Sequence, residues 1–201
     1  MNFQKYVDQL ENKWGTLIRM GDSFVNGRMT FISDVAQLNV MFSPLKNQEI
    51  EQIEMQLGTL PSQLKQLYKQ TNGCRLFFGS LNILGVRKYS DDLFEPYGIV
   101  EENFSVHNEM IKNSCEDSNL VFIASLAGDY FFAHKKEETD KIYCVKRGSS
   151  TVLKEFNDLE EMFDYYFTVL YNEYGSDCKK IHIKPEDKDI PVIAHLSCDF
   201  F

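Results

Sequence analysis

The chain has 201 residues, 43% of them hydrophobic and 13% aromatic, and a formal net charge of −9 from 30 acidic and 21 basic residues. This composition excludes a disordered chain and suits one folded domain that buries about 70% of its unfolded surface. The negative charge argues against general binding to nucleic acid or anionic membranes. It fits a protein partner with a basic face, because opposite fields speed association, although acidity is also ordinary for a cytosolic protein.

The N-terminal sequence and the cysteines predict a cytoplasmic protein. The first eight residues lack the apolar core of a signal peptide, and no stretch approaches the ~18 apolar residues of a membrane span. Five cysteines without a disulfide framework are expected to be reduced thiols.

The first 42 residues predict a helix followed by hairpin or irregular structure. Apolar residues recur at helical spacing over residues 3–14, namely Phe3, Tyr6, Val7, Leu10 and Trp14. Trp14 is the only tryptophan, and we expect it to anchor this helix on the main body. Residues 16–42 contain short apolar pieces between Gly21, Asn26-Gly27 and Ser33-Asp34, which predicts a hairpin or an irregular wrap.

Residues 50–73 predict two helices joined at a sharp corner. One face of the first helix carries Ile50, Ile53 and Leu57. Gly58 follows where a helix commonly ends with a positive φ, and Pro61 suits the first turn of the second helix because that position needs no backbone N–H. The second helix turns inward Leu64, Leu67 and Tyr68. Asn72-Gly73 then offers another left-handed exit.

From residue 76 onward the pattern changes to short strands. Two strands bounded by glycines are expected at residues 76–78 and 81–84. After a loop at 87–98 and a helix at about 100–113, residues 120–124 are apolar throughout, as in a central strand buried on both faces. Its expected antiparallel neighbours are residues 130–134 and 142–145, with residues 151–153 as a fourth candidate.

The last strong helix is expected at residues 158–173. Its apolar stripe comprises Phe156, Leu159, Met162, Phe163, Tyr166 and Leu170. Asn157 or Asp158, with Glu160 or Glu161 three residues on, supplies the start signal. Strands in a run with helices before and after them predict an α+β fold, a mostly antiparallel central sheet with helices packed against it. We divide the chain into an N-terminal extension (1–42), a main domain (43–174) and a C-terminal tail (175–201) that would add a strand.

Three motifs in this order resemble a known superfamily. They are Leu57-Gly58-Thr59-Leu60-Pro61 with Tyr68 and Asn72-Gly73, then Val121-Phe122-Ile123-Ala124 with Gly128-Asp129-Tyr130-Phe131, then Asn157-Asp158-Leu159-Glu160-Glu161-Met162-Phe163. This order over roughly residues 43–172 resembles the SUKH superfamily and, within it, the Smi/Knr family of cell-wall-synthesis-regulator-like proteins. The chain departs from the family where Ala127 precedes Gly128, because members often have further glycines there.

The resemblance implies a SUKH-like domain that binds proteins and has neither catalytic residues nor a cofactor. Bacterial members are mostly immunity proteins that neutralise polymorphic toxins by tight association, and many of those toxins are nucleases or deaminases. We therefore expect a non-catalytic module that binds a toxin domain directly. The alternative is a regulatory or scaffold interaction protein of the fungal type. The motif residues Gly58, Leu60, Pro61, Tyr68, Asn72, Gly73, Gly128 and Asp129 are expected to be mostly structural.

The predicted partner-binding surface is an acidic, aromatic loop over residues 89–102. It contains Tyr89, Asp91, Asp92, Phe94, Glu95, Tyr97, Glu101 and Glu102. Aromatic side chains with charges around them are typical of protein interfaces. The alternative is an exposed loop whose aromatic residues fold back onto the core.

A third hypothesis is a zinc site or an enzyme built around the C-terminal tail. The tail gathers Cys178, His182, His195 and Cys198, and tetrahedral zinc takes thiolate and imidazole ligands from two short segments. The spacing matches no zinc pattern that we recognise, so we expect no metal. A nucleophilic cysteine could also be built from Cys74, His134 and Asp129, but a small buried cysteine is the simpler interpretation.

Overall fold

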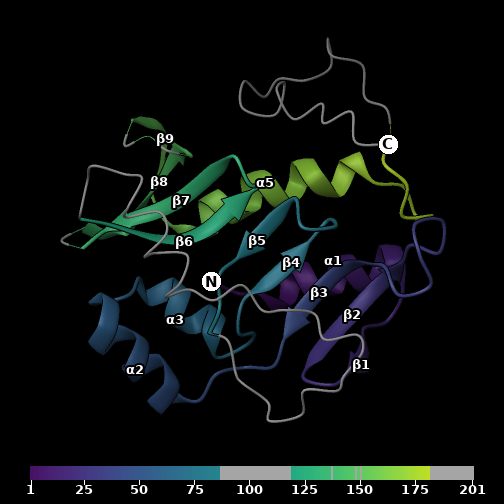
Figure 1. The fold of residues 1–201 in the computed structure, drawn as a ribbon, viewed down its shortest axis with the longest axis horizontal. Coiled ribbons are helices and arrows are strands. Elements are labelled where there is room, and N and C mark those ends of the chain that lie inside the picture. Colours follow the sequence, from purple (N-terminus) through teal and green to yellow (C-terminus); the bar gives the residue numbers. More distant parts are fainter. Residues whose placement is uncertain (87–118, 137, 148, 150, 182–201) are drawn as a thin grey trace.

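The structure is a computed structural model that describes residues 1–86, 119–136, 138–147, 149 and 151–181 (Figure 1). Its helices are α1 (Gln4–Trp14), α2 (Asn47–Leu57), α3 (Ser62–Tyr68) and α5 (Leu159–Glu173). Its strands are β1 (Ile18–Met20), β2 (Ser23–Arg28), β3 (Gln37–Phe42), β4 (Cys74–Leu76), β5 (Leu81–Ile83), β6 (Leu120–Leu126), β7 (Tyr130–Lys135), β8 (Glu138–Lys146) and β9 (Val152–Phe156).

The nine strands form one sheet whose spatial order follows the chain from β1 to β9. Every neighbouring pair is antiparallel. All seven residues of β6 are buried, as the apolar run at residues 120–124 predicts for a central strand. The α+β fold with a mostly antiparallel sheet is therefore confirmed.

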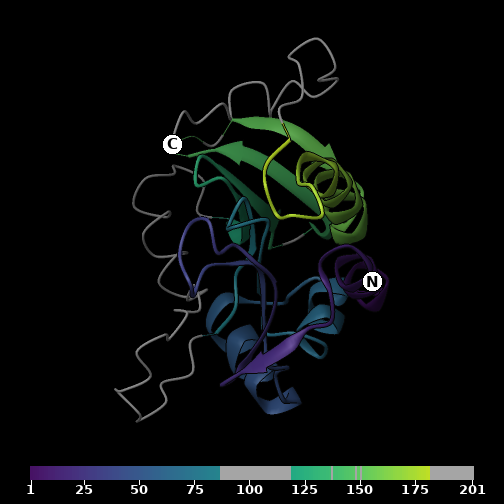
Figure 2. The same cartoon turned by 90° about the vertical axis from the view of Figure 1, so that its right-hand side faces the viewer.

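The helices α1 and α5 lie on the same side of the sheet (Figure 2). The ring of Tyr6 packs edge-on against Phe163 with 4.5 Å between centroids, and the Tyr6 hydroxyl donates to Asp164 at 2.6 Å. At the edge of the same contact, the Lys5 ammonium donates to Glu160 at 2.8 Å. The first and last helices of the described chain thus close the main core together.

The first 42 residues contribute α1 and three strands of the common sheet, where the sequence predicts a hairpin or an irregular wrap. Gly21, with φ of 58°, opens the two-residue turn between β1 and β2. The Trp14 indole donates to the Gly175 carbonyl at 2.7 Å, and its ring packs against Tyr171 and Phe77. Trp14 therefore ties α1 to the chain just after α5.

Two strand predictions differ from the structure in their limits. Phe77 and Phe78 were expected in a strand, but both have φ of 56° and turn the chain after β4. The turn is closed by the Gly79 N–H, which donates to the Leu76 carbonyl at 3.1 Å, and by the Ser80 N–H, which donates to the Phe77 carbonyl at 3.1 Å. The Phe78 N–H donates to the Leu38 carbonyl of β3 at 2.7 Å. The last strand is β9 at Val152–Phe156 rather than residues 151–153.

The last helix begins as its sequence predicts. Asp158 is the N-cap of α5 and accepts the Glu161 N–H at 2.8 Å, while the Glu161 carboxylate accepts the Asn157 N–H at 2.7 Å. These bonds satisfy donors that a helix start leaves unpaired. Among the described helices, none is long and apolar enough to cross a bilayer.

Candidate protein-binding surface

The first motif forms a rigid corner between α2 and α3. Gly58 ends α2 with φ of 94°, and Pro61 is the N-cap of α3. Leu60 is buried between them. The Glu54 carboxylate accepts the Leu60 N–H at 2.9 Å and the Lys65 ammonium at 3.0 Å, so it closes the corner. The sequence pattern alone does not single out Glu54, because its carboxylate reaches Leu60 and Lys65 only after the chain turns back between α2 and α3.

Tyr68 ties α3 to the sheet. Its side chain is completely buried, and its hydroxyl donates to the Leu84 carbonyl at 2.7 Å. Burial raises the pKa of Tyr68 well above its usual value of 10, because the phenolate would lose its hydration. Near neutral pH the hydroxyl therefore stays protonated and can donate this hydrogen bond.

Asn72 and Gly73 hold the chain that follows β5. The Asn72 amide donates to the Val86 carbonyl at 2.7 Å and accepts the Val86 N–H at 2.8 Å. Gly73 has φ of 79°, and a Cβ there would lie 2.5 Å from the Ile83 carbonyl oxygen. A Cβ at Gly85 would overlap the Asn72 backbone. The motif thus fixes the position of Val86, which follows β5.

The predicted interface loop lies outside the described residues. This concerns Tyr89, Asp91, Asp92, Phe94, Glu95, Tyr97, Glu101 and Glu102, together with the helix expected at about 100–113. The structure describes both flanks of this segment, since Val86 follows β5 and Asn119 precedes β6. These two strands are antiparallel neighbours in the sheet.

Gly128 and Asp129 form a tight turn between β6 and β7. Gly128 has φ of 76°, and Ala127 also has a positive φ of 51°. The Asp129 N–H donates to the Leu126 carbonyl at 3.2 Å, and its own carbonyl accepts the Arg147 N–H at 2.7 Å. These contacts are those of a structural turn.

Three adjoining segments carry exposed apolar side chains, and we call this set of residues the tip patch. It comprises Phe31, Ile32 and Val35 from the β2–β3 connection, Phe78 after β4, and Ile181 after α5. Phe31, Phe78 and Ile181 are 52%, 45% and 50% exposed.

Printed contacts connect the segments of the tip patch. The Lys179 ammonium lies 5.8 Å from the centre of the Phe31 ring, and the Phe78 N–H bonds to Leu38 of β3. The β2–β3 connection lies beside the chain that follows α5 (Figure 1). Exposed apolar side chains on adjoining segments make this end of the sheet a candidate surface for association. Sequence reasoning missed this patch, because an apolar residue in an irregular stretch gives no sign of being exposed.

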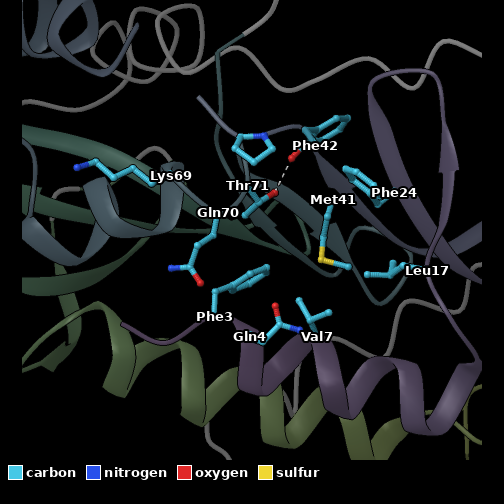
Figure 3. Close-up of a pocket in the computed structure, with 11 residues that line it drawn as sticks. Phe3, Gln4, Val7, Leu17, Phe24, Met41, Phe42, Lys69, Gln70 and Thr71 are labelled. Carbon is cyan, nitrogen blue, oxygen red and sulfur yellow. Dashed lines mark hydrogen bonds between the residues drawn. The ribbon is translucent and has the colours of Figure 1, made fainter. Parts of the chain in front are cut away.

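A cavity of about 380 Å³ opens between the start of α1, the strands β2 and β3, and the chain after α3 (Figure 3). It is lined by Phe3, Gln4, Val7, Leu17, Phe24, Met41, Phe42, Pro44, Lys69, Gln70 and Thr71. The Thr71 hydroxyl, which donates to the Phe42 carbonyl at 2.9 Å, stiffens one wall. Lys69 is the one ionisable side chain in this lining, so the cavity holds no acid–base pair. The lining combines apolar side chains with the polar residues Gln4, Lys69, Gln70 and Thr71.

The structure contradicts the nucleophilic-cysteine arrangement. Cys74 lies in β4, three strands away from β7, which is roughly 14 Å at the usual strand spacing. Asp129 and His134 sit near opposite ends of β7. Burial raises the pKa of the Cys74 thiol to about 12, so the thiolate nucleophile is not available near neutral pH.

Of the four zinc ligands proposed in the C-terminal tail, only Cys178 lies among the residues that the structure describes. Cys178 is buried beside β2 and β3, where a Cβ at Gly27 would lie 3.4 Å from its sulfur. Burial raises the pKa of this thiol. His182, His195 and Cys198 lie outside the described residues. Within the described part of the chain, no group of three or more His, Cys, Asp or Glu side chains is placed to hold a metal ion.

Comparison with known families assigns the chain. A rigid helix corner on an antiparallel sheet, with an exposed apolar patch, is consistent with a protein-binding module. The sequence pattern of the SMI1 / KNR4 family (SUKH-1) matches residues 44–165 of the chain, a range that includes all three motifs. The chain therefore belongs to this family. No curated protein and no solved structure shows a significant match. Membership is consistent with an immunity-like binding module, since members of this family are generally non-catalytic.

Proposed function

We propose that this protein is a cytoplasmic immunity protein that neutralises a cognate toxin domain by binding it, without catalysis. The observation that carries the proposal is the family match over residues 44–165. The net charge of −9 supports a toxin with a basic face, such as a nuclease, because complementary fields accelerate encounter.

We propose that the toxin contacts two surfaces. The first is the tip patch, where Phe31 and Val35 are exposed beside the charged residues Arg28, Asp34 and Lys179. An apolar centre with a polar rim is the usual composition of a protein interface. The second is the acidic, aromatic loop over residues 89–102, with Asp91, Asp92 and Glu95 as its charges.

The test is co-expression with a toxin-domain gene adjacent to the gene of this protein, scored by cell survival and by pull-down. The double variant Phe31→Asp/Val35→Asp should weaken the complex by on the order of 30-fold or more, because a buried apolar anchor is worth about 2 kcal/mol or more. Met55→Asp is the matched control, since Met55 is 82% exposed on α2 and carries the same substitution away from the patch.

Charge reversal at Asp91, Asp92 and Glu95 tests the loop separately. It should slow association and reduce the dependence of affinity on salt. If both sets of variants protect cells as well as Met55→Asp does, the toxin binds elsewhere. If the wild type neither protects nor forms a complex, the regulatory scaffold function replaces the immunity function.

A further inference from the structure

The β8–β9 turn and strand β9 are basic in an acidic protein. Residues 146–156 include three basic residues (Lys146, Arg147 and Lys154) and one acidic residue (Glu155), for a net charge of +2 against −9 for the whole chain. The other end of β8 carries Glu138 and Asp140 beside Lys141, so the whole hairpin has a net charge of +1. Lys146 and Arg147 are exposed and form no ion pair with another described residue. The end of the sheet at the β8–β9 turn is therefore locally positive, whereas the chain as a whole is negative.

The same hairpin carries an open sheet edge. In the described part of the sheet, β9 is the last strand and has a neighbour on one side only. About half of the backbone N–H and C=O groups of an edge strand point away from its partner and remain available to another chain. Figure 1 shows β9 at the outer edge of the sheet, beyond β8.

Two apolar side chains of β9 are exposed at this edge. Val152 is 38% and Leu153 48% exposed. Leu153 has no partner in β8, because Cys144 faces Lys154 and Val145 faces Val152, which leaves Leu153 as an extra residue in β9. These side chains stabilise no core described in the structure, although they are available to pack against an incoming chain.

We propose that β9 binds an acidic, extended segment of a partner protein as an added strand. Main-chain hydrogen bonds to the free edge of β9 would hold the segment, Val152 and Leu153 would pack against its apolar residues, and Lys146 and Arg147 would attract its carboxylates. Strand addition of this kind obtains affinity from the backbone and specificity from side chains beside the edge. The site goes beyond toxin binding and uses a different part of the sheet.

Charge selects an acidic partner over a second copy of this chain. Pairing β9 with β9 of another copy would bring together two basic segments (residues 146–156, net charge +2 each), and like charges across an interface are repulsive. Lysine on an edge strand is a common device against such self-pairing. An acidic strand would avoid this repulsion, because its carboxylates would lie near Lys146 and Arg147, which form no ion pair with another described residue.

The probe is a fluorescein-labelled peptide of alternating glutamate and valine, capped at both ends and titrated with the full-length protein by fluorescence anisotropy. Two control peptides separate charge from strand pairing. One replaces every glutamate with lysine, and the other keeps the glutamates but has N-methyl groups on consecutive central amides, so that neither of its edges can pair. We expect binding of the acidic peptide and much weaker binding of both controls.

Variants of the protein locate the site. Lys146→Glu/Arg147→Glu should weaken binding by roughly tenfold or more, because it removes two attractive contacts and makes both repulsive. Arg19→Glu/Lys69→Glu makes the same charge change elsewhere and should alter affinity by less than roughly twofold. Amide hydrogen exchange at Val152–Glu155 should slow when the acidic peptide binds, since added hydrogen bonds protect these amides.

Each remaining outcome overturns the proposal. No saturable binding of the acidic peptide removes the site, and equal binding of the N-methylated peptide reduces it to nonspecific charge attraction. Equal weakening by the two charge variants moves the site away from β9. Failure here is distinct from failure of the immunity function, because Lys146→Glu/Arg147→Glu leaves the tip patch intact and should still protect cells from a toxin bound there.

Discussion

Tyr68 provides the most direct test of how the family motif supports the fold. Its hydroxyl donates to the Leu84 carbonyl at 2.7 Å inside the core, and both residues are fully buried. Tyr68→Phe removes the donor without changing the shape of the ring, so no large cavity forms. The Leu84 carbonyl is then left without its Tyr68 donor in a place that excludes water. We expect a loss of about 1–3 kcal/mol in the free energy of unfolding, the cost of an unsatisfied buried polar group.

Tyr171 offers the matched comparison. Its hydroxyl reaches the Gln9 carbonyl at 3.5 Å near the surface, so Tyr171→Phe deletes the same atom where water can replace it. We expect this variant to lose less than about 0.5 kcal/mol. Urea unfolding at pH 7, with equal m-values for the three proteins, gives both free energies on one scale. If Tyr68→Phe costs no more than Tyr171→Phe, the Tyr68 hydrogen bond does not hold α3 to the sheet.

Three further predictions follow from burial and backbone geometry. Gly73→Ala should lower the free energy of unfolding by about 3 kcal/mol or more, since the new Cβ would lie 2.5 Å from the Ile83 carbonyl oxygen and the residue has a positive φ. Gly58→Ala should lower it by only about 1–2 kcal/mol, the strain of the positive φ, because no atom beyond its chain neighbours lies within 4 Å of its new Cβ. Urea unfolding measures both values. Burial lowers the pKa of His134, so below pH 6.5 the unfolded chain binds a proton that the folded chain resists, and stability should fall with falling pH. The stability difference between wild type and His134→Phe, measured from pH 7.5 to 5, should therefore shift against the wild type on acidification, and a constant difference would contradict this account. Burial raises the pKa of Cys74 to about 12 and that of Cys144 to about 11. Both thiols should therefore resist alkylation at pH 8 until urea unfolds the protein, which mass spectrometry can follow. Labelling of either thiol in the folded protein would refute this prediction.

Local sequence determined the elements whose signals are local. The start of α5 depends on Asp158 and Glu161, which are three residues apart and bond as that spacing predicts. The corner between α2 and α3 depends on Gly58 and Pro61, whose backbone preferences act within a few residues. The order of these motifs also identified the family, because the family pattern is a pattern along the chain.

Only the tertiary structure decided how the strands join and which apolar residues stay exposed. Nothing within residues 16–42 indicates that β3 pairs with β4, because the pairing of Met41 with Cys74 joins residues far apart in the chain. The side chains of Phe77 and Phe78 predict a strand, yet both residues have a positive φ and lie in a turn, where the Phe78 N–H donates to the Leu38 carbonyl of β3. The tip patch and the β9 edge likewise exist because no described element packs over them, and burial of that kind is a property of the assembled fold rather than of any one segment.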